Sequence, residues 1–443
     1  MASLTLLAPF LVLLAGSAAA KSCTDFIIPV DILSRQGLFK KVPLETNLDV
    51  TAFAQELLRN GQNYTATLLE DYQTLKGSYK ISAKFCHPEG GIGESVVQLL
   101  SHGIGFDKAY WDLPYNDYSN SYTDAALKEG YSVLAIDRLG IGMSSHGDPF
   151  NEIQAQAEVE ALNAVTTKLR KGEVPEIGHS FAKVIHVGHS FGSIQSLWLS
   201  ALYPNNTDGL VLTGWAATGD FTSVFWAGWN MHSARLNQPL RFGNASSSGL
   251  LNTYSAWKAG DALIKGIQMV LNKLGVGLSP DTIWEDIATT EVSNLIRGYN
   301  ETTTPLDYAS GYVSWSDFTA NQFCFLHKGH YDLGLGLFSE ANKQPMTVGE
   351  ALTIGSFPQR SSFSGPVLVF TGREDLPFCG GDCLATGTNA TSIPAGAKAL
   401  FPKATPFEAY IQPDTAHGIN AHYNATGAYQ VINSWLGAHG LGA

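Results

Sequence analysis

The chain has 443 residues, of which 44% are apolar and 15% are charged. This length accommodates one large α/β domain or two ordinary ones, and the apolar fraction supports a sizeable core, so wholesale disorder is excluded. The formal net charge of −12 argues against nucleic acid and anionic membrane surfaces as partners, because both repel an acidic protein.

The first twenty residues have the pattern of a secretory signal peptide. An apolar stretch covers residues 4–15, and alanines at 18–20 supply the small residues of a cleavage site before Lys21. The first three residues contain no lysine or arginine, which departs from the usual pattern, and a buried N-terminal helix is the alternative. No later stretch of the sequence reaches the roughly 18 apolar residues of a membrane span. We therefore expect a secreted, extracellular protein without a membrane span.

Six Asn-x-Ser/Thr sequons, none with a central proline, fit a secreted glycoprotein. These glycosylation candidates are Asn63, Asn205, Asn244, Asn300, Asn389 and Asn424.

The five cysteines suit the same oxidising compartment, which favours disulfides. Cys379 and Cys383 are close enough in sequence to close a small loop, and Cys23 with Cys86 is the next plausible pair. This pairing leaves Cys324 unpaired. No Cys/His spacing resembles a zinc site, so we expect neither a metal nor a cofactor.

Short apolar segments alternate with helix-like segments along most of the chain. The expected strands are residues 79–85, 95–101, 132–136, the run from Val184 onward, 210–213, 366–372 and 406–412, and the expected helices include 49–60 and 151–170. This rhythm predicts the α/β class, with a mostly parallel central sheet flanked by helices.

The rhythm breaks between residues 215 and 357, where the sequence is aromatic, glycine-rich and mostly without strand alternation. Loops of this length without structure of their own are rare, so we expect an inserted, mainly helical lid over the strand ends, where ligands bind in open α/β sheets. The expected organisation is a signal peptide at 1–20, a core formed by 21–214 and 358–443, and a lid at 215–357.

The strongest motif is Gly-His-Ser-Phe-Gly at residues 188–192, which follows an apolar β-branched run. In a G-x-S-x-G turn the serine joins a strand directly to a helix and points outward, and glycines flank it because a Cβ there would collide with neighbouring elements. The next segment has the apolar stripe of a helix, at Ile194, Leu197, Trp198, Ala201 and Leu202. We identify Ser190 as a nucleophile.

A serine nucleophile needs a base, and the base needs an acid that orients it. Where a serine sits on such a strand-to-helix turn, the partners follow it along the chain in the order acid, then histidine, each just after a strand. Asp375 follows a strong strand and is our acid; Glu374 and Asp220 are the alternatives. His417 follows the last strand beside a glycine and is our base, with His422 as a later alternative.

The negative oxygen of a tetrahedral intermediate needs two fixed donors, which backbone N–H groups provide. One should be Phe191, directly after the nucleophile. The other should come from the loop His102-Gly103-Ile104-Gly105, where we choose the amide of Ile104. We expect His102 to brace this loop as a buried histidine.

These segments together resemble the α/β-hydrolase fold superfamily over roughly residues 79–435, and they look most similar to fungal secreted members. The likeness rests on the loop 102–105, the segment Asp-Arg-Leu-Gly-Ile-Gly-Met-Ser at 137–144, the serine turn, the turn 372–375 and His417. Membership implies Ser190, Asp375 and His417 as a triad and Ile104 and Phe191 as oxyanion donors. A serine at the turn disfavours epoxide hydrolases and haloalkane dehalogenases, which use aspartate there.

Six of the nine tryptophans fall in the expected lid: Trp215, Trp226, Trp229, Trp257, Trp284 and Trp315. Such rings either line a pocket for an apolar acyl or aromatic substrate or form the core of the lid itself. Most of them suit the second role. We place Trp215, directly after a strand, in the substrate pocket, together with His189 beside the nucleophile.

The sequence therefore predicts a secreted serine hydrolase that cleaves small-molecule carboxylic esters or lactones through an acyl-enzyme. An acyltransferase using the same triad is the first alternative. A non-catalytic ligand-binding protein is the second, disfavoured because serine, acid and histidine are all present in order.

Overall fold

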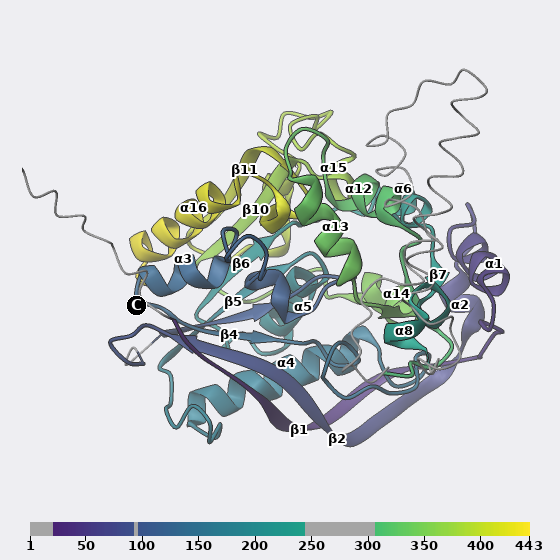
Figure 1. The fold of residues 1–443 in the computed structure, drawn as a ribbon, viewed down its shortest axis with the longest axis horizontal. Helices are drawn as coiled ribbons and strands as arrows, with labels where there is room; N and C mark the ends of the chain where they lie inside the picture. Colours follow the sequence, from purple (N-terminus) through teal and green to yellow (C-terminus); the bar gives the residue numbers. More distant parts are fainter. Residues whose placement is uncertain (1–20, 93–95, 244–305) are drawn as a thin grey trace, which may run out of the picture.

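The computed structural model describes residues 21–92, 96–243 and 306–443. Its centre is an eight-stranded sheet with the strand order β1-β2-β4-β3-β5-β6-β10-β11 (Figure 1). All neighbours from β4 to β11 are parallel, whereas β1–β2 and β2–β4 are antiparallel. The mostly parallel sheet expected from the sequence is confirmed.

The parallel strands other than the edge strand β11 are largely buried, because helices cover both faces of this part of the sheet. They are β3 (Val96–Ser101), β4 (Ser132–Ile136), β5 (Lys183–His189), β6 (Gly209–Thr213), β10 (Val367–Glu374) and β11 (Phe407–Ala416). The expected bounds of β3, β4 and β6 agree to within one residue. β11 continues four residues beyond the expected end and so reaches the position before His417.

The β1 edge of the sheet is a long antiparallel ribbon, of which the sequence predicted only part of one strand. β1 (Ser22–Phe39) pairs with β2 (Leu69–His87), and we expected only residues 79–85 of β2. Pro29 and Gly37 interrupt the strand signal of β1; the proline is tolerated because β1 is the edge strand. Helices α1 (Asn47–Leu57) and α2 (Tyr64–Leu68) connect the two strands.

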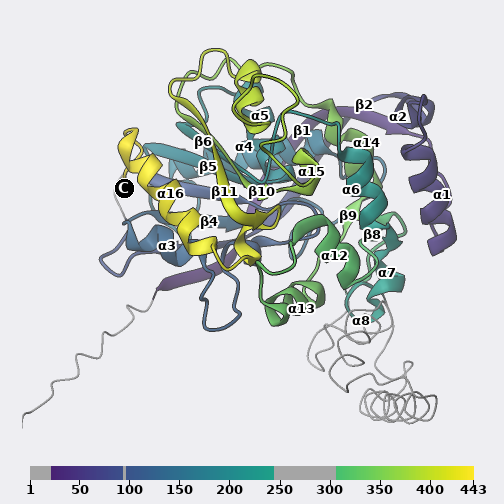
Figure 2. The ribbon, with the colours of Figure 1, turned by 90° about the horizontal axis from the view of Figure 1, so that it is seen from above.

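Two pairs of helices cover the two faces of the parallel sheet (Figures 1 and 2). The core on one face joins α4 (Ala155–Lys171) and α5 (Phe191–Leu202) to strand residues such as Val97 and Leu99. The core on the other face joins α3 (Tyr122–Lys128) and α16 (Ala425–Ala438) to Val96 and Leu100. The alternation of side chains along β3 thus divides the interior into two layers.

The described parts of the segment 215–357 are mainly helical but also contain a small sheet that we did not expect. The helices are α6 (Thr222–Trp229), α7 (Ala234–Asn237), α8 (Pro239–Phe242), α12 (Phe318–Phe325), α13 (Leu333–Ala341) and α14 (Val348–Thr353). The antiparallel sheet has the order β7-β8-β9, formed by His232–Ser233, Tyr312–Ser314 and Met346–Thr347.

This segment lies beside the turn that follows β10. Helices α6 and α12 both contact α15 (Leu376–Cys379), the short helix directly after that strand. Figure 1 shows α6, α12 and α13 gathered at this end of the sheet. Trp257 and Trp284 lie outside the described residues. The division of the chain into a core and a separate lid stays a prediction.

Several features predicted near the surface can be placed. Asn63, Asn205 and Asn389 are exposed, and Asn424 is half-buried, with its side-chain amide donating to the carbonyl of Pro413. Asn244, Asn300 and the expected signal peptide at residues 1–20 lie outside the described residues. Among the described residues, no helix combines the length and apolar character needed to cross a membrane.

Both expected disulfides are present, and Cys324 is free and buried. Cys23–Cys86 joins β1 to β2 across 63 residues of sequence, whereas Cys379–Cys383 spans four residues just after β10. The first disulfide therefore cross-links the two strands of the edge ribbon, and the second closes the turn that contains α15.

We expect the two disulfides to stabilise the protein unequally. Cross-linking restricts the unfolded chain more when the closed loop is longer, so replacing Cys23 and Cys86 by alanine should lower the free energy of unfolding by about 4 kcal/mol. The same replacement of Cys379 and Cys383 should lower it by about 2 kcal/mol. Guanidinium denaturation of both double variants measures the difference, and an equal or reversed order would contradict this account.

Candidate active site

Ser190 occupies a strained turn between β5 and α5. Its φ of 54° and ψ of −115° lie in a region that side-chain-bearing residues rarely adopt. A Cβ on Gly188 would lie 2.5 Å from the backbone of Gly192, and one on Gly192 would lie 2.3 Å from the carbonyl oxygen of Ser101. Both glycines are therefore required for the close approach of α5 to the sheet, as the motif predicts.

The side chains of Ser190, His417 and Asp375 form a continuous chain of contacts. Nε2 of His417 is 2.9 Å from Oγ of Ser190, and Nδ1 is 2.8 Å from Oδ2 of Asp375. His417 and Asp375 are fully buried. When Nδ1–H donates to the carboxylate, Nε2 is left free to accept the serine proton.

Asp375 is held by two further donors, neither of which the sequence reasoning identified. The hydroxyl of Thr371 donates to Oδ2 at 2.6 Å, and the amide of Phe378 donates to Oδ1 at 3.0 Å. The amide belongs to α15, which Asp375 caps. Thr371 lies four residues earlier, on β10, and only its position on this strand could have indicated it.

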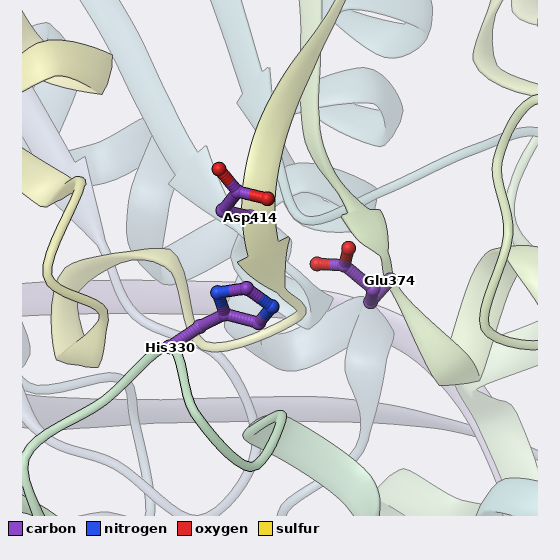
Figure 3. Close-up of side chains that lie close together, drawn as sticks. All are labelled: His330, Glu374 and Asp414. Carbon is purple, nitrogen blue, oxygen red and sulfur yellow. The ribbon is translucent and has the colours of Figure 1, made fainter.

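The alternative acids do not contact His417. Asp220 is exposed, and the side chain of Glu374 points toward Asp414 and His330 rather than into this site (Figure 3). Among the described residues, His330, Glu374 and Asp414 form the one group of His, Cys, Asp and Glu side chains close enough to share a metal ion.

His422, the alternative base, instead braces the loop that carries His417. Its Nδ1–H donates to the carbonyl of Gly418 at 2.9 Å, and its Nε2 accepts from the amide of Ala416 at 3.1 Å. Both bonds require a neutral ring. Burial lowers the pKa of His422 to about 4, although the bond to Gly418 opposes the shift, and nearby histidines, His330 first, add to it.

The loop after β3 passes directly beside the serine. A Cβ on Gly103 would lie 2.8 Å from the Cβ of Ser190, so only glycine fits there. Ile104 and Phe191 both border the same cavity as Ser190. Within the described ranges, neither backbone amide has a hydrogen-bond acceptor. The arrangement leaves two N–H groups next to the serine that are free to bind a ligand oxygen.

His102 holds this loop in place, as expected. Its Nδ1–H donates to the carbonyl of Gly103 at 2.8 Å, and its Nε2 accepts from the amide of Arg138 at 3.0 Å. Burial, and next the charge of Arg138, hold the pKa of His102 well below its usual range, so the ring is neutral.

Arg138 also packs against the ring of Phe191. Its guanidinium lies 4.7 Å from the centre of the Phe191 ring and pairs with Glu158 at 2.5 Å and Glu350 at 2.6 Å. All three charged groups are buried. Burial raises the pKa of Glu158 well above its usual range, against the opposing charge of Arg138. The sequence reasoning did not identify this cluster, because Glu158 and Glu350 come from the distant helices α4 and α14.

A cavity of about 340 Å³ opens onto Ser190. Its lining is mostly apolar and, over the described ranges, includes no charged side chain. The lining residues come from the serine turn, from the segment after β6 with α6, and from the turns near residues 354–359 and 377–378; its aromatic members are Phe191, Trp215, Phe225, Trp226, Phe357 and Phe378.

The structure separates the two residues that we placed in the substrate pocket. Trp215 lines the cavity, but His189 does not. The ring of His189 is fully buried, stacks on Tyr110 with ring centres 4.4 Å apart, and lies 5.0 Å from the ring of His417. His189 therefore lies beside His417 and outside the lining of this cavity, in contrast to our assignment.

The buried ring of His422 should make stability depend on pH. The unfolded ring, with a pKa near 6.5, binds a proton at pH values where the folded ring does not. The free energy of unfolding should therefore fall as pH falls from about 6.5 to about 4, by up to about 1.4 kcal/mol per pH unit for this group.

The variant His422→Gln removes this titrating group. Between pH 6.5 and pH 4, its free energy of unfolding should therefore fall less steeply with falling pH than that of the wild type, by up to about 1.4 kcal/mol per pH unit. Denaturation at a series of pH values measures both slopes. Parallel curves for the wild type and the variant would show that His422 titrates alike in both states.

Comparison with known proteins agrees with this architecture. Residues 98–320 match the model of the alpha/beta hydrolase family, which is half of the chain. A secreted triacylglycerol lipase, LIP2, from Malassezia furfur is 26% identical over 163 residues; the match covers 35% of this chain and only about a third (32%) of the relative.

Similar solved structures include an esterase from Thermogutta terrifontis, at 14% identity with a TM-score of 0.40 over 82% of this chain and 95% of that one. An alpha/beta hydrolase fold protein from Chitinophaga pinensis has 13% identity and a TM-score of 0.42 over 81% and 94%. A Vigna radiata epoxide hydrolase has 16% identity and a TM-score of 0.39 over 82% and 95%. On the family match, the chain belongs to the alpha/beta hydrolase family.

Proposed function

We propose that this hydrolase cleaves carboxylic esters or lactones through an acyl-enzyme formed on Ser190. The contact chain from Ser190 through His417 to Asp375 carries the proposal. It joins a nucleophile, a base and an orienting acid, which are the parts that serine acyl transfer requires.

The geometry suggests how each group would act. Oγ of Ser190 attacks the carbonyl carbon while Nε2 of His417 takes its proton, and Asp375 stabilises the imidazolium through Nδ1–H. The amides of Ile104 and Phe191 hold the developing oxyanion. His417 then returns the proton to the leaving alcohol. In the second half, His417 takes a proton from water, the hydroxide attacks the acyl carbon, and the acid is released as Ser190 regains its proton.

The cavity supports an apolar acyl group as the substrate feature that binds next to Ser190. Aromatic walls, with no charged side chain among the described lining residues, favour an apolar group over a charged one. The partial likeness to a secreted triacylglycerol lipase supports the choice of an ester bond. The proposed reaction uses no cofactor.

We also propose that the protein is secreted as a glycoprotein. The two disulfides support an oxidising compartment. Exposure of Asn63, Asn205 and Asn389 supports these three as the first candidates for glycosylation. In this proposal, residues 1–20 act as a signal peptide that is removed during export.

Replacing the nucleophile tests the proposed function directly. On a panel of esters and lactones of graded acyl length, Ser190→Ala should lower kcat by at least about 10³-fold, because no other hydroxyl occupies the strained turn. Ser196→Ala is the matched control, since that hydroxyl only donates to the carbonyl of Gly192 within the same helix, and it should keep most of the activity. Equal activity of the Ser190→Ala variant and the wild type would overturn the assignment.

A second pair of variants identifies the acid. Asp375→Asn should lower kcat by about 10⁴-fold, because an amide cannot hold the histidine in the same tautomer or stabilise its charged form. Asp220→Asn should leave kcat near that of the wild type, since Asp220 is exposed. Steady-state kinetics on the best ester of the panel measure both, and the reverse result would move the acid to the earlier strand.

A further inference from the structure

His330, Glu374 and Asp414 come from three distant parts of the sequence and point toward one another (Figure 3). His330 lies between α12 and α13, Glu374 ends β10, and Asp414 belongs to β11. One donor atom from each residue lies within 4.8 Å of the other two. The cluster is separate from the cavity at Ser190, whose lining includes none of the three.

In the part of the chain that the structure describes, these three side chains form no hydrogen bonds or ion pairs with one another. Oε2 of Glu374 is buried and has no hydrogen-bond partner there. A buried carboxylate oxygen is normally paired, because leaving it unpaired forfeits its hydration without compensation. This oxygen is therefore open to a cation or a hydrogen-bond donor, although Glu374 as a whole is only half-buried and Asp414 is exposed.

A single cation fits between the three donors. Because the three donor atoms lie within 4.8 Å of one another, a point exists that is no more than about 2.8 Å from each. Zinc binds histidine nitrogen and carboxylate oxygen at about 2.0–2.2 Å. Rotations that move each donor by less than about 1 Å would therefore complete the site.

We propose that His330, Glu374 and Asp414 bind one divalent transition-metal ion, with zinc as the reference ion. Two carboxylates balance its charge, and an imidazole donor favours zinc over calcium or magnesium, which take oxygen ligands. Three protein ligands leave a fourth position for water. The proposal is independent of the proposed esterase activity.

The ion would link three segments that meet around the candidate triad. Glu374 is adjacent to Asp375, and Asp414 lies three residues before His417. His330 belongs to a loop that already contacts the His417 loop, since its carbonyl accepts from the amide of Tyr423 at 2.9 Å. Metal binding should therefore raise the thermal stability of the folded chain.

Binding of zinc alone to the tag-free, chelator-treated full chain tests the proposal. Calorimetry should find one zinc per chain, and zinc should raise the melting temperature. Glu374→Gln, His330→Gln and Asp414→Asn should each weaken binding by at least about tenfold, because each removes one of three ligands. Asparagine suits position 414, where φ is 51°.

His327→Gln is the matched control. His327 is exposed and its ring stacks on His330, with centres 5.2 Å apart, but it is not part of the cluster, so this variant should bind zinc like the wild type. Circular dichroism checks that every variant is folded. Absence of zinc binding by the folded wild type, or equal binding by all variants, would overturn the site, and tighter binding of calcium at these residues would overturn the assignment of the metal.

Discussion

The strained backbone of Ser190 is the constraint on which the rest of the site depends. A φ of 54° is retained only because α5 packs so closely on β5 and β3 that neither Gly188 nor Gly192 could carry a side chain. That packing lifts the serine hydroxyl above the carboxyl ends of the parallel strands. Asp375, His417 and the loop of Ile104 follow other strands of the same sheet, so their convergence is a consequence of strand order.

Neutral histidines hold the loops that surround the serine. His102 fixes the loop of Ile104, and His422 fixes the loop of His417, each by donating from Nδ1 and accepting at Nε2. This use requires one tautomer and no charge, which burial enforces by lowering both pKa values. His417 therefore contacts Ser190 directly, whereas His102 and His422 are kept neutral and hold the neighbouring loops.

The sequence predicted those features that are local in the chain. The serine turn, the strands before it and after it, and the positions of Asp375 and His417 all follow from short motifs at strand ends. What it missed depends on contacts between distant segments. Thr371 is recognisable only once Asp375 is known to turn back toward β10, and the residues around Arg138 come from three separate elements. All of β1 was missed because an exposed edge strand with a proline carries little periodic signal.

The wall of the cavity and the loop of His417 are joined by a chain of contacts. The amide of Gly418, next to His417, donates to the carbonyl of Phe325 at the end of α12, and the Phe325 ring lies 5.7 Å from the His417 ring. Helix α12 in turn contacts α6, which lines the cavity with Phe225 and Trp226. The α6 wall of the cavity and the loop of His417 are therefore connected through α12. In the proposed acyl transfer, this packing would couple the fit of the acyl group in the cavity to the alignment of His417 with Ser190.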